Sequence, residues 1–217
     1  MWYKPVLFGW QIPKLRQRML TERQERNLII GGDDIPTPQR YPYYVAIDKN
    51  NGVIVSGALI APDIVLSAGH VALDAMTNVT IKIGPFAVHE PEPFVEIMAV
   101  KSWKLFENWT FLAPGFFAED YMIIQLDGRS SHKPIRLNRD PTVPIPGTIV
   151  TMMGFGWTNA THTSPPLHLQ QAELMTITND ECEAAHDPKR PEISYIQMAP
   201  ESVLCTKSPP NTTRDGW

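Results

Sequence analysis

His70 and Asp120 are the residues of this sequence whose types and settings best suit proton transfer. Histidine is the usual general base at neutral pH, because its unperturbed pKa is about 6.5. His70 ends the run 63–70, where we expect a strand to pass into a short helix. Asp120 directly precedes the apolar run 121–126, so its carboxylate should be partly buried and should need a partner, which the ring N–H of His70 can supply.

Each of these residues also has an ordinary structural interpretation. A lone histidine is most often a surface or core side chain, and an aspartate beside a strand is often a turn or capping residue. Asp127, which follows the same apolar run, fits that second interpretation better than Asp120 does. A histidine–aspartate pair also needs a nucleophile before it can cleave a peptide bond.

The elements that must position this pair are predicted to be strands. The 21 prolines and 13 glycines punctuate many short apolar runs, which favours an all-β protein with many turns. Residues 79–83 alternate between polar and apolar types, as in a half-buried strand. Further apolar runs predict buried strands at 53–60, 94–100, 121–126 and 148–153, and no amphipathic helix is expected between residues 120 and 156.

Composition and charge narrow the classes of function. The chain has 217 residues, 43% of them hydrophobic, and a formal net charge of -4, which argues against a general nucleic-acid binder. No apolar run is long enough for a membrane span. Residues 1–28 carry six Lys or Arg and two Glu, and we expect a leader or pro-segment there without a convincing signal peptide. Four Asn-X-Ser/Thr triplets, at Asn78, Asn108, Asn159 and Asn211, favour a secreted, glycosylated chain.

Three segments, in this order, resemble the trypsin/chymotrypsin-like serine peptidases. Residues 29–32, Ile-Ile-Gly-Gly, resemble the family's mature N-terminus. Residues 66–71, Leu-Ser-Ala-Gly-His-Val, resemble its histidine block, and residues 119–126 resemble its aspartate block. The resemblance extends from Ile29 to Trp217, but the sequence contains no Gly-Asp-Ser-Gly-Gly serine block.

The resemblance implies two antiparallel six-stranded β-barrels of the chymotrypsin type, the second of them truncated. The expected organisation is a leader at 1–28, a first barrel at 29–127, a linker at 128–146 and a partial second barrel at 147–217.

The resemblance also implies roles for single residues. His70 would be the general base and Asp120 the acid that orients it, in the order His, Asp, Ser of the chymotrypsin-type triad. Ile29 would provide the activating N-terminus, although Leu28 precedes it where the family usually has Arg or Lys. Asp215 would lie at the base of the primary specificity pocket and bind an Arg or Lys side chain of the substrate.

The cysteines give a separate test of the resemblance. The family commonly bridges the positions held here by Ser56 and Val71, and both cysteines are missing together. Cys182 and Cys205 match the ends of a loop that the family bridges in its second barrel. No Cys/His cluster has the spacing of a metal site, and no cofactor is expected.

Two functions follow as hypotheses from different classes. The first is a secreted serine endopeptidase that cleaves after Arg or Lys, here lacking its nucleophile segment, with protein or peptide substrates and protein protease inhibitors as its expected partners. The second is a catalytically inactive homologue that uses the same scaffold to bind other proteins. Neither hypothesis requires a nucleic acid or a membrane.

Overall fold

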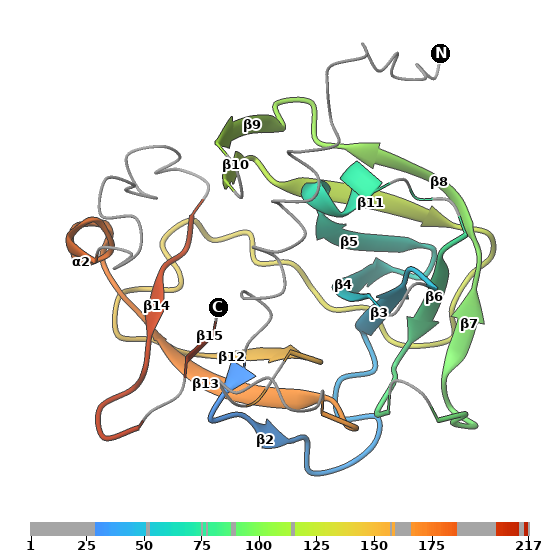
Figure 1. Ribbon diagram of the computed structural model, residues 1–217, viewed down its shortest axis with the longest axis horizontal. Helices are drawn as coiled ribbons and strands as arrows, with labels where there is room; N and C mark the ends of the chain where they lie inside the picture. The colour runs from blue at the N-terminus through green and yellow to red at the C-terminus, as the bar shows by residue number, and fades with distance from the viewer. Residues whose placement is uncertain are drawn as a thin grey trace.

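The computed structural model describes residues 29–50, 53–74, 76, 78–87, 90–113, 116–156, 158, 166–185, 203–212 and 215–216. Within these residues the regular secondary structure is almost entirely strand, as predicted, and most of the strands belong to two curled sheets (Figure 1). The expected leader 1–28 lies outside the described residues. No helix in the described part is long and apolar enough to cross a membrane.

The larger sheet has the strand order β7-β6-β3-β4-β5-β11-β8, with all neighbouring strands antiparallel. Its strands are β3 (Tyr44–Asp48), β4 (Ile54–Ala61), β5 (Ile64–Ala68), β6 (Thr80–Ile83), β7 (Glu96–Met98), β8 (Val100–Leu105) and β11 (Tyr121–Leu126).

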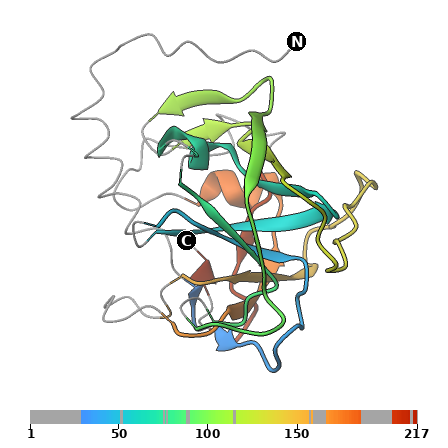
Figure 2. The same ribbon diagram turned by 90° about the vertical axis from the view of Figure 1, so that its right-hand side faces the viewer.

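The predicted strand at residues 94–100 is divided between the two edges of this sheet. β7 pairs with β6 at one edge, whereas β8 pairs with β11 at the other, and only Ala99 separates the two strands. A nearly continuous strand that pairs with both edges closes the sheet on itself, which removes its free edges. Because β7 and β8 act as one strand, the seven labelled strands form one barrel of six. Figure 2 shows the molecule from the side.

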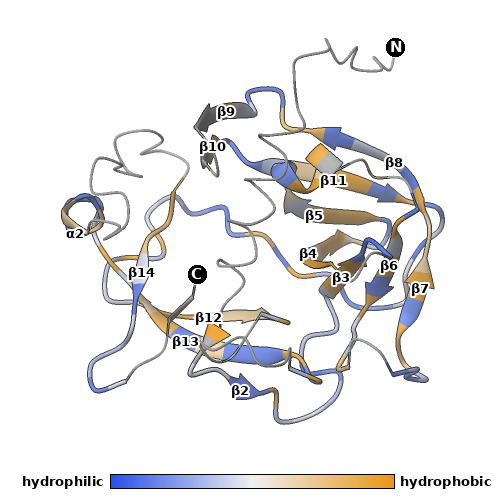
Figure 3. Ribbon diagram, in the orientation of Figure 1, coloured by the Kyte–Doolittle hydropathy of each residue, from blue (hydrophilic) through white to orange (hydrophobic). Residues whose placement is uncertain are grey.

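The barrel core follows the two-residue period of the strands. Met122, Ile124 and Leu126 of β11 are at most 1% exposed, while Tyr121 and Ile123, which alternate with them, are 43% and 37% exposed. Ile81 and Ile83 of β6 alternate in the same way with half-buried residues. Hydrophobic and hydrophilic bands alternate along β6 and β8 in Figure 3.

The second sheet consists of β12 (Ile149–Gly154), β13 (Gln170–Thr176) and β14 (Thr206–Lys207), with β2 (Asp33–Asp34) paired to β13. Between Leu126 and Ile149 the chain crosses from one sheet to the other without a strand or helix. Two short pairs complete the strands, β1 (Ile29–Ile30) with β15 (Asp215–Gly216) and β9 (Thr110–Ala113) with β10 (Phe116–Ala118).

A second apolar cluster joins the two sheets through β3. Val45 and Ile47 of this strand point into the barrel core, whereas Tyr44 and Ala46 belong to a separate cluster with Leu169, which directly precedes β13. Met153 and Phe155 of the β12 region pack against the same cluster. β3 is consequently buried on both of its faces, and the barrel and the second sheet pack against each other there.

Helix α2 (Asn179–Ala184) was not predicted from the sequence. Its N-terminus has a capping box, in which the Thr178 side chain accepts from the Glu181 backbone N–H while the Glu181 carboxylate accepts from the Thr178 N–H. Thr-X-X-Glu is a known helix-start signal and could have revealed this helix.

Candidate active site

The pairing of β5 with β11 brings the histidine and aspartate blocks together. In this antiparallel pair Ala68, the last residue of β5, lies opposite Tyr121, the first residue of β11. His70 and Asp120 therefore both leave the sheet at the same end. The Gly69 N–H donates to the Asp120 carbonyl at 3.0 Å and continues the pairing beyond the strands.

His70 lies in the 3-10 helix η1 (Gly69–Asp74), which follows β5 directly, as the sequence predicted. The buried Lys49 anchors this helix, since its Nζ donates to the Val71 carbonyl at 2.6 Å. Val71 itself is 1% exposed and belongs to the barrel core. The ring of His70 thus extends from an element that is fixed on its inner side.

The two side chains are in hydrogen-bonding contact, so the Asp120 carboxylate has the His70 ring as the partner that we expected for it. His70 Nδ1 lies 2.6 Å from Asp120 Oδ2, and the His70 backbone N–H donates to Asp120 Oδ1 at 2.7 Å. The two side chains are 33% and 25% exposed, so the pair is shielded but open to one side. If Nδ1 carries the proton that it shares with the carboxylate, Nε2 is the unprotonated ring nitrogen and has the basicity to accept a proton.

Two aromatic residues that sequence reasoning did not select complete this site. The Trp109 indole N–H donates to Asp120 Oδ1 at 2.9 Å. The Phe117 ring stacks on the His70 ring, with centroids 5.5 Å apart and planes inclined by 17°. In the sequence Trp109 stood out only as the middle residue of a glycosylation triplet, and no local pattern linked either residue to the histidine.

The surroundings of Asp120 keep its carboxyl in the charged form. Burial alone would raise the pKa of this carboxyl, but hydrogen bonds from the His70 ring, the charge of that ring, and hydrogen bonds from the Trp109 indole and the His70 backbone outweigh it. The net effect is a pKa below the usual aspartate value. Asp120 therefore remains an acceptor that can hold the imidazole and stabilise it when it becomes protonated.

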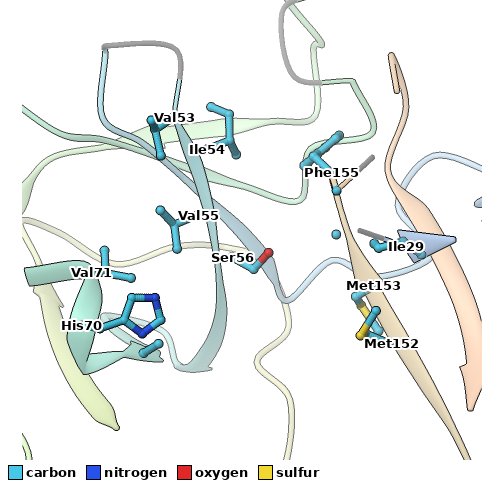
Figure 4. Close-up of a pocket in the computed structure, with 13 residues that line it drawn as sticks. Ile29, Val53, Ile54, Val55, Ser56, His70, Val71, Met152, Met153 and Phe155 are labelled. Carbon is cyan, nitrogen blue, oxygen red and sulfur yellow. The ribbon is translucent and has the colours of Figure 1, made fainter. Parts of the chain in front are cut away.

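His70 opens onto a cavity of about 300 Å³ between the barrel and the second sheet. Figure 4 shows His70 and Ser56 on the barrel side of this cavity and Met152 and Phe155 on the side of β12. The Ser56 hydroxyl is paired with the buried Tyr44 hydroxyl at 2.7 Å, so it acts as part of the scaffold. The His70 ring thus lies beside a space that a substrate or a further chain segment could enter.

The described residues contain no group of three or more His, Cys, Asp and Glu side chains that could hold a metal ion. The arrangement is a histidine ring in contact with a partly buried carboxylate. A pair of this kind can activate a hydroxyl nucleophile in acyl transfer.

Comparison with known families assigns the scaffold. The family model for trypsin matches residues 29–215. The chain belongs to the trypsin family. Among solved structures it is similar to neuropsin, a serine protease expressed in the limbic system of mouse brain, with a TM-score of 0.66 and 20% identity over 83% of this chain and 75% of that one. The predicted chymotrypsin-type β fold is therefore confirmed.

Curated relatives of the chain differ in their described roles. Glucanase inhibitor protein 2 of Phytophthora sojae is 28% identical over 72% of this chain and 54% of its own length. The snake venom serine protease NaSP of Naja atra is 26% identical over 86% of this chain and 61% of its own length. Human granzyme M is 26% identical over 60% of this chain and 50% of its own length. The chain thus spans about half to three fifths of the length of these relatives.

Ile29, at the start of the family match, is 4% exposed and lines the central cavity. It packs closely on Gly32, where a Cβ atom would lie 2.6 Å from the Ile29 Cγ2 atom. The backbone of β1 pairs with β15, which sets Ile30 opposite Asp215. The trypsin-family N-terminal segment and the segment of the expected specificity aspartate are therefore neighbours, while the roles of Ile29 and Asp215 stay predictions.

The predicted disulfide between Cys182 and Cys205 is confirmed. The two residues are bonded, with their Cα atoms 6.0 Å apart. The bond ties α2 to the strand β14, which begins at Thr206. At the other expected bridge position, Ser56 and Val71 both line the central cavity in place of a disulfide.

Proposed function

We propose that this chain carries the base and the orienting acid of a trypsin-type serine endopeptidase. The observation that carries the proposal is the contact of 2.6 Å between His70 Nδ1 and Asp120 Oδ2, beside an open cavity. In this proposal Nε2 of His70 takes the proton of a serine hydroxyl as the hydroxyl attacks a peptide carbonyl, and later gives it to the leaving amine. Asp120 stabilises the imidazolium formed in between.

The serine itself would come from a Gly-Asp-Ser-Gly-Gly segment, which residues 1–217 do not contain. The backbone N–H groups that stabilise the oxyanion would surround that serine. Loss of the nucleophile costs about a millionfold in kcat in a well-studied serine protease. We therefore expect the 217-residue chain by itself to be practically inactive.

We further propose that the active form begins at Ile29 and cleaves after Arg or Lys. Asp215 would supply the carboxylate that binds the basic side chain of the substrate. Secretion, glycosylation and activation from a precursor belong to the same proposal. The disulfide is typical of an oxidising compartment, and Asn78, Asn108 and Asn211 are all exposed, as glycan acceptors must be.

The decisive first experiment is to sequence the transcript beyond the codon for Trp217. A reading frame that continues into Gly-Asp-Ser-Gly-Gly favours the peptidase, and a genuine stop codon favours an inactive homologue. The extended protein, begun at Ile29, is then assayed on peptides that differ only in the residue before the scissile bond. Cleavage after Arg or Lys that is lost in His70→Ala supports the proposal, whereas a preference for Phe or Leu contradicts the role of Asp215.

A second candidate function is the binding and inhibition of another enzyme. The similarity to a glucanase inhibitor protein favours it, together with the absence of the serine block from these residues. Titration of the 217-residue chain into a glucanase, with calorimetry and glucanase activity as readouts, tests this alternative. Saturable binding with loss of glucanase activity would support it, and no binding at micromolar concentrations would exclude that partner.

A further inference from the structure

Asp120 receives a hydrogen bond from outside the histidine block. The Trp109 indole donates to Oδ1, the same oxygen that accepts the His70 backbone N–H, and this leaves Oδ2 facing the His70 ring. Two donors on one oxygen restrict rotation of the carboxylate about its Cβ–Cγ bond. The indole N–H is only a donor and cannot take up a proton from the base, so it fixes the carboxylate without competing in proton transfer.

Gly69 makes the space that this indole occupies. A Cβ atom at position 69 would lie 2.6 Å from Trp109 Cδ1 and 2.8 Å from Nε1, closer than real Cβ contacts occur. The residue directly before the histidine is therefore small where the tryptophan enters. Glycine at 69 and tryptophan at 109 form a steric pair, although they are 40 positions apart in the sequence.

The aromatic ring of Phe117 connects the same tryptophan to the histidine ring. Trp109 stacks on Phe117 with centroids 5.5 Å apart and planes inclined by 23°, and Phe117 stacks in turn on His70. Trp109 precedes β9 and Phe117 lies in β10, so both come from one short strand pair beside η1 (Figures 1 and 2). Trp109 and Phe117 thus contact both members of the histidine–aspartate pair.

We propose that Trp109 is a positioning residue for the His70–Asp120 pair, with Gly69 as the position that admits it. The indole N–H holds the Asp120 carboxylate in the orientation that presents Oδ2 to His70 Nδ1. The catalytic meaning of this role rests on the peptidase function proposed above, but the geometry can be tested without a nucleophile. A tryptophan that served only to fill space would not need its N–H.

The test replaces Trp109 by Phe, which keeps an aromatic ring in the stack and removes the N–H. Proton NMR of the folded chain then follows the exchange of the His70 ring N–H with water, and carbon NMR follows the Asp120 carboxyl through a pH titration. We expect exchange to accelerate roughly two- to tenfold, as for the loss of one hydrogen bond, and the pKa of Asp120 to rise. Trp103→Phe, in β8 against the barrel core, is the matched control and should change neither readout.

Gly69→Ala tests the contact between the Trp109 indole and Asp120 by removing the space that the indole occupies. The added methyl group should displace the indole, and its effects should resemble those of Trp109→Phe. The double variant should show less than the sum of the two effects, because both changes remove one shared interaction. If Trp109→Phe does not fold, β-(3-benzothienyl)alanine at position 109 keeps the shape of the indole and lacks only the N–H.

Exchange and titration in the Trp109 variants that match those of Trp103→Phe would overturn the proposal. A loss of stability without a change in either readout would assign Trp109 a packing role only, and would also overturn it. Neither readout depends on peptide hydrolysis. An extended protein without peptidase activity would therefore refute the proposed function and leave this result intact. Conversely, an active extended protein whose Trp109 variants match Trp103→Phe in both readouts would support the proposed function and refute the role of Trp109.

Discussion

At the scale of single residues, Asp120 is the centre of the site, because both of its carboxylate oxygens accept hydrogen bonds. In Asp120→Asn one carboxylate oxygen is replaced by an NH2 group, which cannot accept the hydrogen bonds that His70 and Trp109 donate. We expect the free energy of unfolding at neutral pH to fall by about 1–3 kcal/mol. Urea unfolding measures this change, and Asp127→Asn, at an exposed carboxylate after β11, should have almost no effect.

The same variant should be less sensitive to acid. The folded-state pKa of Asp120 lies below the ordinary aspartate value, so the stability that this carboxylate provides is fully present above that value, about 3.9. It is lost as the pH falls through the lowered pKa of the folded state. The difference between the wild type and Asp120→Asn should therefore shrink below about pH 4, and a difference that stays constant down to pH 2 would contradict this assignment.

The residue scale also shows where sequence reasoning stops. His70 and Asp120 could be found because each stands at a fixed place beside an apolar run. Trp109 could not, because its contact with Asp120 depends on how the β9–β10 pair folds over η1 and on the space left at Gly69. A hydrogen bond between side chains on different elements leaves no local periodicity or spacing to detect.

At the scale of elements, the short connection before β11 sets the direction of the acid. Glu119 has a φ of 50°, in the left-handed region that side chains other than glycine rarely adopt. The Tyr121 N–H donates to the Glu119 carbonyl at 2.7 Å across this tight bend. The bend places the Asp120 side chain toward η1 at the point where β11 begins.

This strain predicts opposite effects for two substitutions of Glu119. Glu119→Gly should be neutral or should stabilise the fold by up to about 1 kcal/mol, whereas Glu119→Val should destabilise it by about 1–2 kcal/mol. Urea unfolding distinguishes these outcomes. Glu107→Gly, at an exposed turn residue outside the left-handed region, serves as the control and should lose stability slightly. Equal losses in both glycine variants would mean that the bend at Glu119 is not strained.

Strands could be predicted from the sequence where burial of one face makes apolar residues recur at a regular interval. β6, β11 and β12 lie close to the predicted runs, since strands with a buried face repeat every two residues. The 94–100 run was predicted as one strand, but its division at Ala99 depends on barrel closure, which is a property of the whole sheet. Helix α2 has no buried residues and hence no apolar stripe, so only its capping box could have indicated it.

At the scale of the whole molecule, the barrel and the second sheet meet along β3, and the His70–Asp120 pair belongs to the barrel alone. The disulfide lies at the far side of the second sheet, where Cys205 precedes β14. It closes a loop between residues 23 positions apart, which should stabilise the folded chain by about 3–4 kcal/mol on the chain-entropy model.

Replacing both cysteines should therefore loosen one half of the molecule more than the other. In Cys182→Ala/Cys205→Ala we expect backbone hydrogen exchange to accelerate in β13 and β14, because β14 pairs with β13 through only Thr206 and Lys207 and depends on the bond to stay in place. Exchange in β5 and β11 should change little, since the closed barrel holds those strands. Mass spectrometry of peptides from both sheets measures this contrast, and the reduced wild type should behave like the variant. Equal acceleration in both sheets would show instead that the packing of the two sheets at β3 makes the molecule one cooperative unit. The geometry of the histidine–aspartate pair would then depend on the Cys182–Cys205 disulfide, although that bond lies in the other half of the fold.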